Sequence, residues 1–301
     1  MITDQAARLR EIFDTIQDHQ KSKQKSNSGR AQTIAITSGK GGVGKTNLAL
    51  NIAIALQEME KKVLLVDADL NLANLDILMG ISPRRTLRDA ALGLKSITEV
   101  IVQGPGGVHL LPAHSGASDI FGIENILKER LIQQLILLES QYDYIIVDTA
   151  AGIARYVIDF VAYADEVIVV ISSEPTSIMD AYAVIKVAHK KNPQIRVRIL
   201  VNQIKSVSEG KEAFEKVKIA ADRFLKLSLV PIGFIFSDIN VIKAVKNQQP
   251  FILAYPQSSA SHCIYKITKQ ILEGVSNIIF SGADQSFFQR VFSGLKEFVA
   301  S

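Results

Sequence analysis

The chain has little cysteine and no apolar run long enough to cross a bilayer. Its single cysteine, Cys263, has no disulfide partner within the 301 residues, and no Cys/His cluster has the spacing of a metal site. One cysteine is also too few for the thiolate ligands of an iron–sulfur cluster. A transmembrane helix needs roughly 20 apolar residues, and the charged, polar N-terminus does not resemble a secretory signal. We therefore expect a cytoplasmic protein that is neither secreted nor integral to a membrane.

The composition predicts one large folded core. Of the 301 residues, 48% are hydrophobic and 21% are charged, which is enough for a single α/β domain with an extension at each end. The net charge of +4 and the isoelectric point near 9.0 permit an anionic partner, either a nucleic acid or a lipid surface. That charge balance is too mild to identify the partner.

Residues 38–46, Ser-Gly-Lys-Gly-Gly-Val-Gly-Lys-Thr, have the sequence of a phosphate-binding loop. The loop follows a predicted strand, Thr33–Thr37, and precedes a predicted apolar helix, Asn47–Met59. Glycines let the backbone curl so that its N–H groups point at phosphate oxygens, and the positive end of the helix dipole adds to the attraction. Lys45 is expected to reach the terminal phosphates and Thr46 to ligate Mg²⁺. The predicted phosphate-binding residues are Gly39, Lys40, Gly41, Gly42, Val43, Gly44, Lys45 and Thr46.

Short apolar runs alternate with longer amphipathic segments along the rest of the chain. The predicted strands span residues 33–37, 62–67, 108–112, 144–148, 166–172, 195–201 and 227–232. This alternation predicts an α/β fold, a doubly wound and mostly parallel sheet of the P-loop type. In such a sheet the ligand sits at the carboxyl ends of the strands, which is where the remaining polar motifs fall.

Two of the predicted strands end in carboxylates. The strand at 62–67 ends in Asp67 and is followed by Asp69, and the strand at 144–148 ends in Asp148. Carboxylates at the tip of a buried strand are placed to orient a water molecule or to hold Mg²⁺ near a γ-phosphate. For Asp67 two roles remain open, one at the metal and one in anchoring the loop that follows.

A second lysine in the loop, Lys40, precedes Lys45 and is long enough to reach the nucleotide of a neighbouring subunit. With this lysine the chain resembles the deviant Walker A family, the MinD/ParA ATPases. The resemblance implies that Lys40 contacts the phosphates of the partner's ATP, so that hydrolysis depends on an ATP-bound homodimer. It also implies that Asp69 positions the attacking water and that Asp148, the Walker B aspartate, holds a Mg²⁺-bound water. The residues expected to be catalytic are therefore Lys40, Lys45, Asp69 and Asp148.

Three further residues lie in segments that resemble the two switch loops of this family. Asn74 and Asp76 match positions that meet the partner subunit, although their residue types are equally compatible with a helix cap. Ala150 stands where the family usually has proline or glycine. That change leaves Asp148 intact and makes the flexibility of the second switch an open question.

The segments after the later strands predict the residues that bind the base. By resemblance to the family, Asn202 hydrogen-bonds adenine, and the loop at 233–238 covers the base and supplies Phe236 and Asp238. Glu174 is a fourth candidate, and each of the last three also has an ordinary interpretation as a turn or cap residue. An asparagine amide matches the donor and acceptor pattern of adenine, and the guanine-specific Asn-Lys-x-Asp pattern is absent. The sequence therefore favours ATP over GTP.

Residues 1–30 are predicted to form a separate N-terminal segment. Residues 4–10 have the sequence Asp-Gln-Ala-Ala-Arg-Leu-Arg, and residues 19–30 form a basic linker without an acid, which we expect to be flexible. The first string resembles the activator motif of the FlhG family, also called FleN or YlxH, which are MinD-like regulators of flagellar number and placement. In that family the motif docks as a helix on the GTPase FlhF and stimulates its GTP hydrolysis; the alternative is an N-terminal helix without a partner. The residues expected to bind FlhF are Asp4, Gln5, Ala6, Leu9 and Arg10.

Residues 283–301 are predicted to form a C-terminal amphipathic helix, with one apolar stripe opposite a polar face. Phenylalanines beside cations suit the lipid interface, and MinD and FlhG proteins resemble this chain in ending with a membrane-targeting helix that dimerisation makes effective. The alternative is a helix packed on the core, and a helix docked without ATP and released with it would combine both. The residues expected to contact the membrane are Phe287, Phe288, Val291, Phe292, Leu295 and Phe298.

The combined expectation is a slow, dimerising ATPase domain at residues 31–282 that acts as a switch. By resemblance it requires ATP and Mg²⁺, binds FlhF and flagellar basal-body components, and associates peripherally with the anionic inner face of the bacterial cell membrane. No specific nucleic acid is expected. A division-site MinD would lack the N-terminal motif, a DNA-partitioning ParA would need a basic surface patch, and a metabolic ligase would need a small-substrate pocket.

Overall fold

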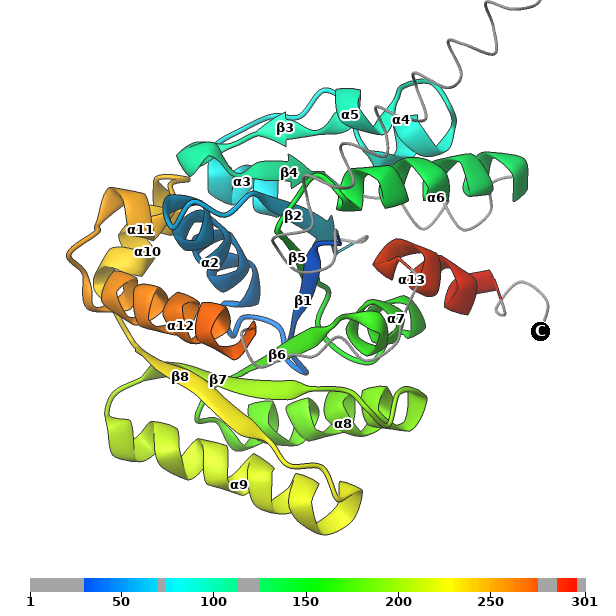
Figure 1. Cartoon of the computed structure of the whole chain (residues 1–301). Helices are drawn as coiled ribbons and strands as arrows, with labels where there is room; N and C mark the ends of the chain where they lie inside the picture. The colour runs from blue at the N-terminus through cyan, green and yellow to red at the C-terminus, as the bar shows by residue number, and fades with distance from the viewer. Residues whose placement is uncertain (1–29, 70–73, 113–124, 276–285, 297–301) are drawn as a thin grey trace, which may run out of the picture.

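The computed structural model describes residues 30–69, 74–112, 125–275 and 286–296 (Figure 1). These residues form one eight-stranded sheet in the order β3-β4-β2-β5-β1-β6-β7-β8, in which only β3 and β4 pair antiparallel. The doubly wound, mostly parallel fold that the sequence predicts is confirmed. The strands are β1 (Gln32–Thr37), β2 (Val63–Ala68), β3 (Val102–Gln103), β4 (His109–Leu111), β5 (Tyr144–Thr149), β6 (Glu166–Ile171), β7 (Val197–Ile204) and β8 (Val230–Phe236).

Helices cover both faces of the sheet and enclose two apolar cores (Figure 1). One core lies between the sheet and α4 (Leu87–Ala91), α5 (Ile97–Val100), α6 (Asn125–Glu139), α7 (Arg155–Tyr163), α8 (Pro175–Lys191), α9 (Val207–Leu225) and α13 (Phe287–Lys296). The other lies between the sheet and α2 (Lys45–Glu58), α3 (Leu75–Met79), α10 (Ile239–Lys246), α11 (Phe251–Ala254) and α12 (Ser259–Val275). A short 3-10 helix, η1 (Pro105–Gly107), precedes β4.

The arrangement of the central strands determines the position of the predicted phosphate-binding loop, residues 38–46. All six residues of β1 are buried, as are all six of β2, β5 and β6, so these strands are covered on both faces. β1 lies between β5 and β6, at the point where the strand order turns in opposite directions. The loop after β1 therefore opens into the crevice at the carboxyl ends of the strands, where doubly wound sheets bind ligands.

The last strand departs from the prediction. β8 spans Val230–Phe236 instead of residues 227–232, because the apolar run that begins at Leu227 starts before the strand does. Pro231 is tolerated within β8 because this is an edge strand, which needs no N–H donor there. Residues 233–236 consequently belong to a strand, and the prediction that 233–238 form one loop over the base was wrong.

The C-terminal helix α13 is docked on the protein, beside α6 and α7 (Figure 1, red). Phe287, Phe288, Val291 and Phe292 are buried in the core, with exposed fractions of 0%, 2%, 0% and 5%. The packed state is therefore the one found, and the predicted membrane contact requires these side chains to leave the core. The side chain of Leu295 and all of Phe298 lie outside the described residues, as do the predicted FlhF-binding residues 4–10. No helix in the described parts of the chain is both long and apolar enough for a membrane span.

Candidate functional site

The phosphate-binding loop joins the carboxyl end of β1 to the amino end of α2. Gly42 has φ 81° and Gly44, the N-cap of α2, has φ 91° and ψ 13°, a left-handed conformation that favours glycine. Gly39 is required for a different reason, since a Cβ atom there would lie 2.1 Å from the carbonyl carbon of Asp180 in α8. Backbone shape and close packing thus leave free N–H groups at the start of α2, which form a concave site for an anion.

Lys45 and Asp148 form a buried ion pair at the centre of the site. Lys45 Nζ lies 2.9 Å from Asp148 Oδ1, and the two side chains are 8% and 1% exposed. Burial raises the pKa of Asp148, while the charge of Lys45 and hydrogen bonds from Lys45 and Thr46 act to lower it. A carboxylate and a hydroxyl are oxygen donors of the kind that Mg²⁺ prefers. Thr46 and Asp148 therefore fit the predicted metal site.

Asp67 faces Asp148 across the pairing of β2 with β5. Burial and the nearby charge of Asp148 raise the pKa of Asp67 to about 8. Its Oδ1 atom accepts a hydrogen bond from the backbone N–H of Asp69 at 3.0 Å. Asp67 thus anchors the start of the first switch loop, and the negative field of Asp69 adds to the effect of burial, which is the main cause of the raised pKa of Asp148. A bound cation would relieve this field, and the roles of Asp69 in positioning water and of Asp67 at the metal stay predictions.

Lys40 has partners other than the Lys45–Asp148 pair. Its ammonium group forms an ion pair with the carboxylate of Glu174 and lies 3.2 Å from the hydroxyl of Thr176, at the start of α8. The side chain of Lys40 is 40% exposed and that of Glu174 is 61% exposed. Lys40 is therefore held on the surface beside its own loop, and Glu174, which the sequence predicted at the base, lies beside Lys40 instead.

The other predicted base-binding residues share one cavity beside the loop. This cavity has a volume of about 570 Å³ and is lined by Gly44, Asn202, Phe236 and Asp238, among others. Asn202 Nδ2 donates to the carbonyl oxygen of Val43 at 2.8 Å, and a Cβ atom on Gly44 would lie 2.5 Å from the same nitrogen. The amide of Asn202 is thereby fixed against the phosphate loop, at a place suited to a base whose phosphates occupy that loop.

Much of the cavity wall was missed by sequence reasoning. Asp238 caps α10, accepting hydrogen bonds from the N–H groups of Asn240 at 2.9 Å and Ala260 at 3.2 Å. The cap role that the sequence left open for Asp238 is thus present, and it directs the first turns of α10 toward the cavity. The sequence did contain a signal for this helix, because an aspartate that follows a strand is a common N-cap residue. The lining residues that were missed include Asn47, Leu48, Gln203, Val241 and Ile242.

The second switch segment is tied to the strand and loop beside it. Gly152 donates its N–H to the carbonyl oxygen of Ser38 at 2.9 Å, and the Thr149 hydroxyl donates to the carbonyl oxygen of Ile36 at 3.2 Å. Gly152 has φ 93°, whereas Ala150 is buried. The segment after Asp148 thus keeps a glycine in a left-handed conformation although Ala150 replaces the usual proline or glycine.

Asn74 and Asp76 lie at the start of α3. Asn74 occupies the N-cap position, and Asp76 Oδ1 accepts a hydrogen bond from the backbone N–H of Ile77 at 2.7 Å. The position at a helix start fits a cap, but the side chain of Asn74 makes no capping hydrogen bond to α3. Their contact with a partner subunit stays a prediction.

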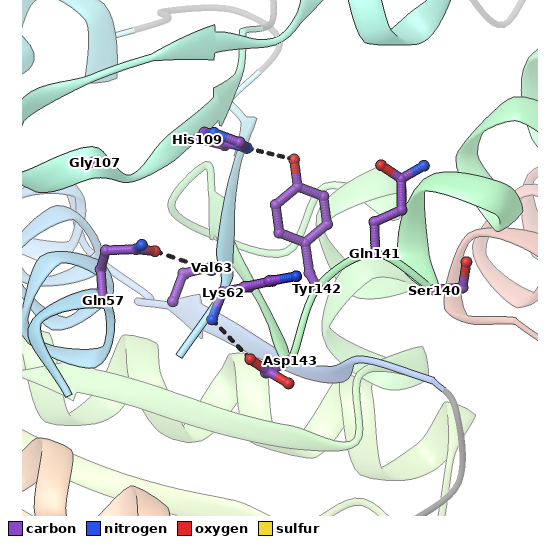
Figure 2. A pocket seen from close by; sticks show the side chains of 9 residues that line it. All are labelled: Gln57, Lys62, Val63, Gly107, His109, Ser140, Gln141, Tyr142 and Asp143. Atoms are coloured by element: carbon purple, nitrogen blue, oxygen red, sulfur yellow. Dashed lines mark hydrogen bonds between the residues drawn. The ribbon is translucent and has the colours of Figure 1, made fainter. Parts of the chain in front are cut away.

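A second cavity, of about 680 Å³, lies at the amino ends of β2 and β4, at the opposite edge of the sheet (Figure 2). His109 Nδ1 and the Tyr142 hydroxyl lie 2.7 Å apart at its wall, and Asp143 accepts a hydrogen bond from the backbone N–H of Lys62 at 2.8 Å. Burial raises the pKa of Tyr142 to about 12, so its hydroxyl stays protonated at neutral pH. None of the predicted nucleotide residues lines this cavity, which is separate from the phosphate loop.

Comparison with known proteins agrees with this geometry. A family model described as an AAA domain matches residues 31–199. The antiactivator FleN of Pseudomonas aeruginosa is 42% identical over 240 residues, covering 80% of this chain and 86% of FleN. The flagellum site-determining protein YlxH of Helicobacter pylori is 32% identical over 281 residues, covering 89% of this chain and 92% of YlxH. MinD in the MinC:MinD cell division protein complex of Aquifex aeolicus aligns with a TM-score of 0.66 at 30% identity, covering 81% of this chain and 96% of that one.

The fold and the phosphate-binding loop define a P-loop ATPase of the MinD/ParA type, which hydrolyses ATP with Mg²⁺. Within that class the chain belongs to the FlhG family of MinD-like ATPases, whose members are also called FleN or YlxH. The predictions of ATP, of Mg²⁺ and of the family are confirmed.

Proposed function

We propose that this ATPase is a dimerising switch that sets flagellar number and placement by stimulating the GTPase FlhF. The observation that carries the switch is the exposed position of Lys40. A lysine that served only its own nucleotide would be expected to face its own phosphate loop, but Lys40 lies on the surface beside Glu174 and Thr176. This position supports a role for Lys40 across a homodimer, where it would meet the nucleotide of the second subunit.

The remaining roles follow from the site. Lys45 and the N–H groups of the loop bind the phosphates, where they stabilise the charge that develops during phosphoryl transfer. Thr46 and Asp148 hold Mg²⁺, which neutralises phosphate charge. Asp69 directs the attacking water, and the fixed amide of Asn202 recognises adenine. Because the product that matters is a change of conformational state, slow hydrolysis would serve as a timer.

Flagellar control rests on the relatives and on the N-terminal motif. The relatives include an antiactivator, FleN, and a protein named for determining the flagellum site, YlxH. Residues 4–10 match the activator motif of the family, with Gln5 and Leu9 as its central polar and apolar contacts. These features support FlhF as the partner over a division-site or DNA-partitioning role.

Membrane association is the third element of the proposal. The buried stripe of α13 that includes Phe287 and Phe292 is the face that would enter a lipid interface. Since one short helix is a weak anchor, two helices in an ATP-bound dimer would bind where one does not. The proposed location is therefore the cytoplasm, with reversible attachment to the inner face of the cell membrane.

The decisive test is the GTPase rate of purified FlhF with the full chain, and with a Gln5→Ala, Leu9→Ala double variant as the matched control. Stimulation by the native chain alone supports the proposal. If FlhF responds to neither protein, the proposed partner is wrong. If it responds equally to both, the assignment of the contact to Gln5 and Leu9 is wrong. Size-exclusion chromatography with a slowly hydrolysed ATP analogue, comparing the native chain with Lys40→Ala, tests the dimer separately.

A further inference from the structure

The residues that precede β1 and α13 meet at one carboxylate. Arg30 precedes β1, Ser286 precedes α13, and both contact Glu139, the last residue of α6. Arg30 Nε lies 3.0 Å from Glu139 Oε1, and the Ser286 hydroxyl donates to Oε2. The backbone N–H of Phe287 also donates to Oε1, at 3.3 Å. Glu139 therefore caps the N-terminus of α13 and at the same time pairs with Arg30.

Asp165 is a second carboxylate that connects Arg30 with α13. Arg30 Nη2 lies 2.8 Å from Asp165 Oδ1, and Arg290 Nη2 of α13 lies 3.4 Å from the same oxygen. The other oxygen, Oδ2, accepts hydrogen bonds from the hydroxyl and the N–H of Thr33 in β1, at 2.7 Å and 2.9 Å. The carboxylate is thus fixed by the central strand β1 and shared by Arg30, which precedes that strand, and Arg290 of α13.

Burial makes these contacts depend on one another. Glu139 is only 2% exposed, and a buried carboxylate is costly unless a cation and hydrogen-bond donors compensate it. Without Arg30, the docking of α13 would bury Glu139 with a hydroxyl and an amide but without its closest cation. Without α13, water would reach the pairs that Arg30 makes, and exposed ion pairs are weak.

We propose that Arg30, Glu139, Asp165 and Arg290 form a latch that couples the docking of α13 to the anchoring of the chain at Arg30. Each event stabilises the other, because a coupling between two equilibria is reciprocal. The biological role of the latch rests on the proposed function. Arg30 follows the proposed FlhF motif in the sequence, and α13 carries the face proposed to bind the membrane. A signal that releases Arg30 thereby also favours the release of α13, and the reverse holds as well.

The first arm of the test measures amide hydrogen exchange in the full-length, nucleotide-free protein. Arg30→Ala is expected to speed exchange of the amides at 288–293 about tenfold, the effect of losing one charged hydrogen bond in a local equilibrium. Glu139→Gln keeps the size of the side chain but removes its charge, and it should act in the same direction. The matched control is Lys216→Ala, which removes an exposed ion pair with Glu212 (2.7 Å) far from α13 in sequence.

The amides of the central strands report whether the variants stay folded, and their exchange is expected to remain as slow as in the native protein. Faster exchange confined to α13 supports the latch, because a pair that served only global stability would speed exchange everywhere. Native-like protection of α13 in both Arg30→Ala and Glu139→Gln overturns it, and so does an equal acceleration throughout the chain.

The second arm reverses the perturbation. Phe288→Glu places a charge on the docking face of α13, where Phe288 is 2% exposed, and so favours release of the helix. Trypsin cleavage after Arg30, measured relative to cleavage after Lys25 in the same molecule, is expected to become about tenfold faster. An unchanged ratio overturns the latch, as does a response in only one arm, because the coupling must be reciprocal. Neither arm contains FlhF or lipid, so failure of the latch is distinguishable from failure of the proposed function.

Discussion

The nucleotide edge and the latch are both clusters of partly or fully buried charge, but only one of them is balanced. At the nucleotide edge, Asp67, Asp69 and Asp148 gather near Lys45, and the pKa of Asp67 rises to about 8 as a result of burial and of its neighbour Asp148. At the latch, the two arginines are matched by two carboxylates. An excess of buried carboxyl groups over cations marks a place that receives a cation, whereas balanced charge marks a surface that the chain fills by itself.

The largest effect of a substitution is expected at Lys45, the cation that the carboxyl groups of the nucleotide edge surround. Lys45→Ala should lower the rate of ATP hydrolysis at least about a hundredfold, because the site loses the cation that meets the transferred phosphate. It also leaves Asp148 buried without the ammonium group that lies 2.9 Å away in the native protein. Phosphate release at saturating ATP and Mg²⁺ measures the effect, and near-native hydrolysis by the variant would remove Lys45 from the site. Lys40→Ala is the contrasting variant, expected to keep ATP binding in the monomer and to lose the hydrolysis that depends on the dimer.

Gly39 and Gly41 of the phosphate-binding loop form a matched pair, because an added Cβ atom would meet close packing at the first and open space at the second. A Cβ atom on Gly39 would lie 2.1 Å from Asp180 and 2.5 Å from the N atom of Ala181, both backbone atoms of α8, whereas one on Gly41 would meet nothing within 4 Å. Gly39→Ala should therefore lower the free energy of unfolding by about 2 kcal/mol. Gly41→Ala should change it by no more than about 0.5 kcal/mol. Urea unfolding of the nucleotide-free variants decides the matter, and equal effects would show that the approach of α8 does not constrain the loop.

The raised pKa of Asp67 also predicts that the free energy of unfolding depends on pH. Native Asp67 has a pKa of about 8 against 3.8 for the ordinary side chain, so between these values the native state binds a proton that the unfolded state does not. Stability from this proton is fully present below about pH 4 and is lost as the pH rises through 8. Asp67→Asn, which keeps the acceptor for the N–H of Asp69, should flatten this loss and raise the free energy of unfolding at pH 8 by about 2 kcal/mol.

Denaturant unfolding at pH 5, 6, 7 and 8 without nucleotide provides the measurement. The exposed Glu212 supplies the control, since Glu212→Gln should leave the pH dependence unchanged. A native slope in the Asp67→Asn variant would mean that burial and the charge of Asp148 do not raise the pKa of Asp67, and the contrast with the latch would fail.

Sequence reasoning was most successful where one short segment determines the structure. The loop at 38–46 and the strand-end aspartates Asp67 and Asp148 were found because a buried parallel strand delivers its polar residue to a known edge. The predicted start of β8 was wrong because Leu227 and Leu229 extend the apolar pattern of the strand, while the pairing with β7 begins only near Val230. The register of an edge strand is set by its pairing with the neighbouring strand, and that information is not present in the sequence of the edge strand itself.

The contacts that the sequence did not reveal join distant parts of the chain. Arg30 and Glu139 are separated by more than a hundred residues, and neither belongs to a motif. The pair of Lys40 with Glu174 is of the same kind, since only the fold places the start of α8 beside the phosphate loop. The periodicity of α13 predicted an apolar face correctly, but two partners, lipid and the protein core, satisfy such a face equally. Tertiary packing selects between them, and in this state it selects α6 and α7.

The smallest predicted effect has an unusual sign. Arg30→Ala removes a positive charge, and simple attraction to anionic lipid would then predict weaker binding to vesicles that contain phosphatidylserine. The latch predicts the opposite, because loss of Arg30 makes docking of α13 less favourable and increases the population of the released helix. Binding without nucleotide should therefore rise about threefold to tenfold in a vesicle co-sedimentation assay.

Lys25→Ala makes the same change of charge in the predicted linker and should leave binding unchanged or slightly weaker. If Arg30→Ala binds no better than Lys25→Ala, then either α13 stays docked or its released face does not enter lipid. Hydrogen exchange of α13 in the same variant distinguishes these outcomes. Fast exchange without vesicle binding would keep the latch and remove the membrane role of α13.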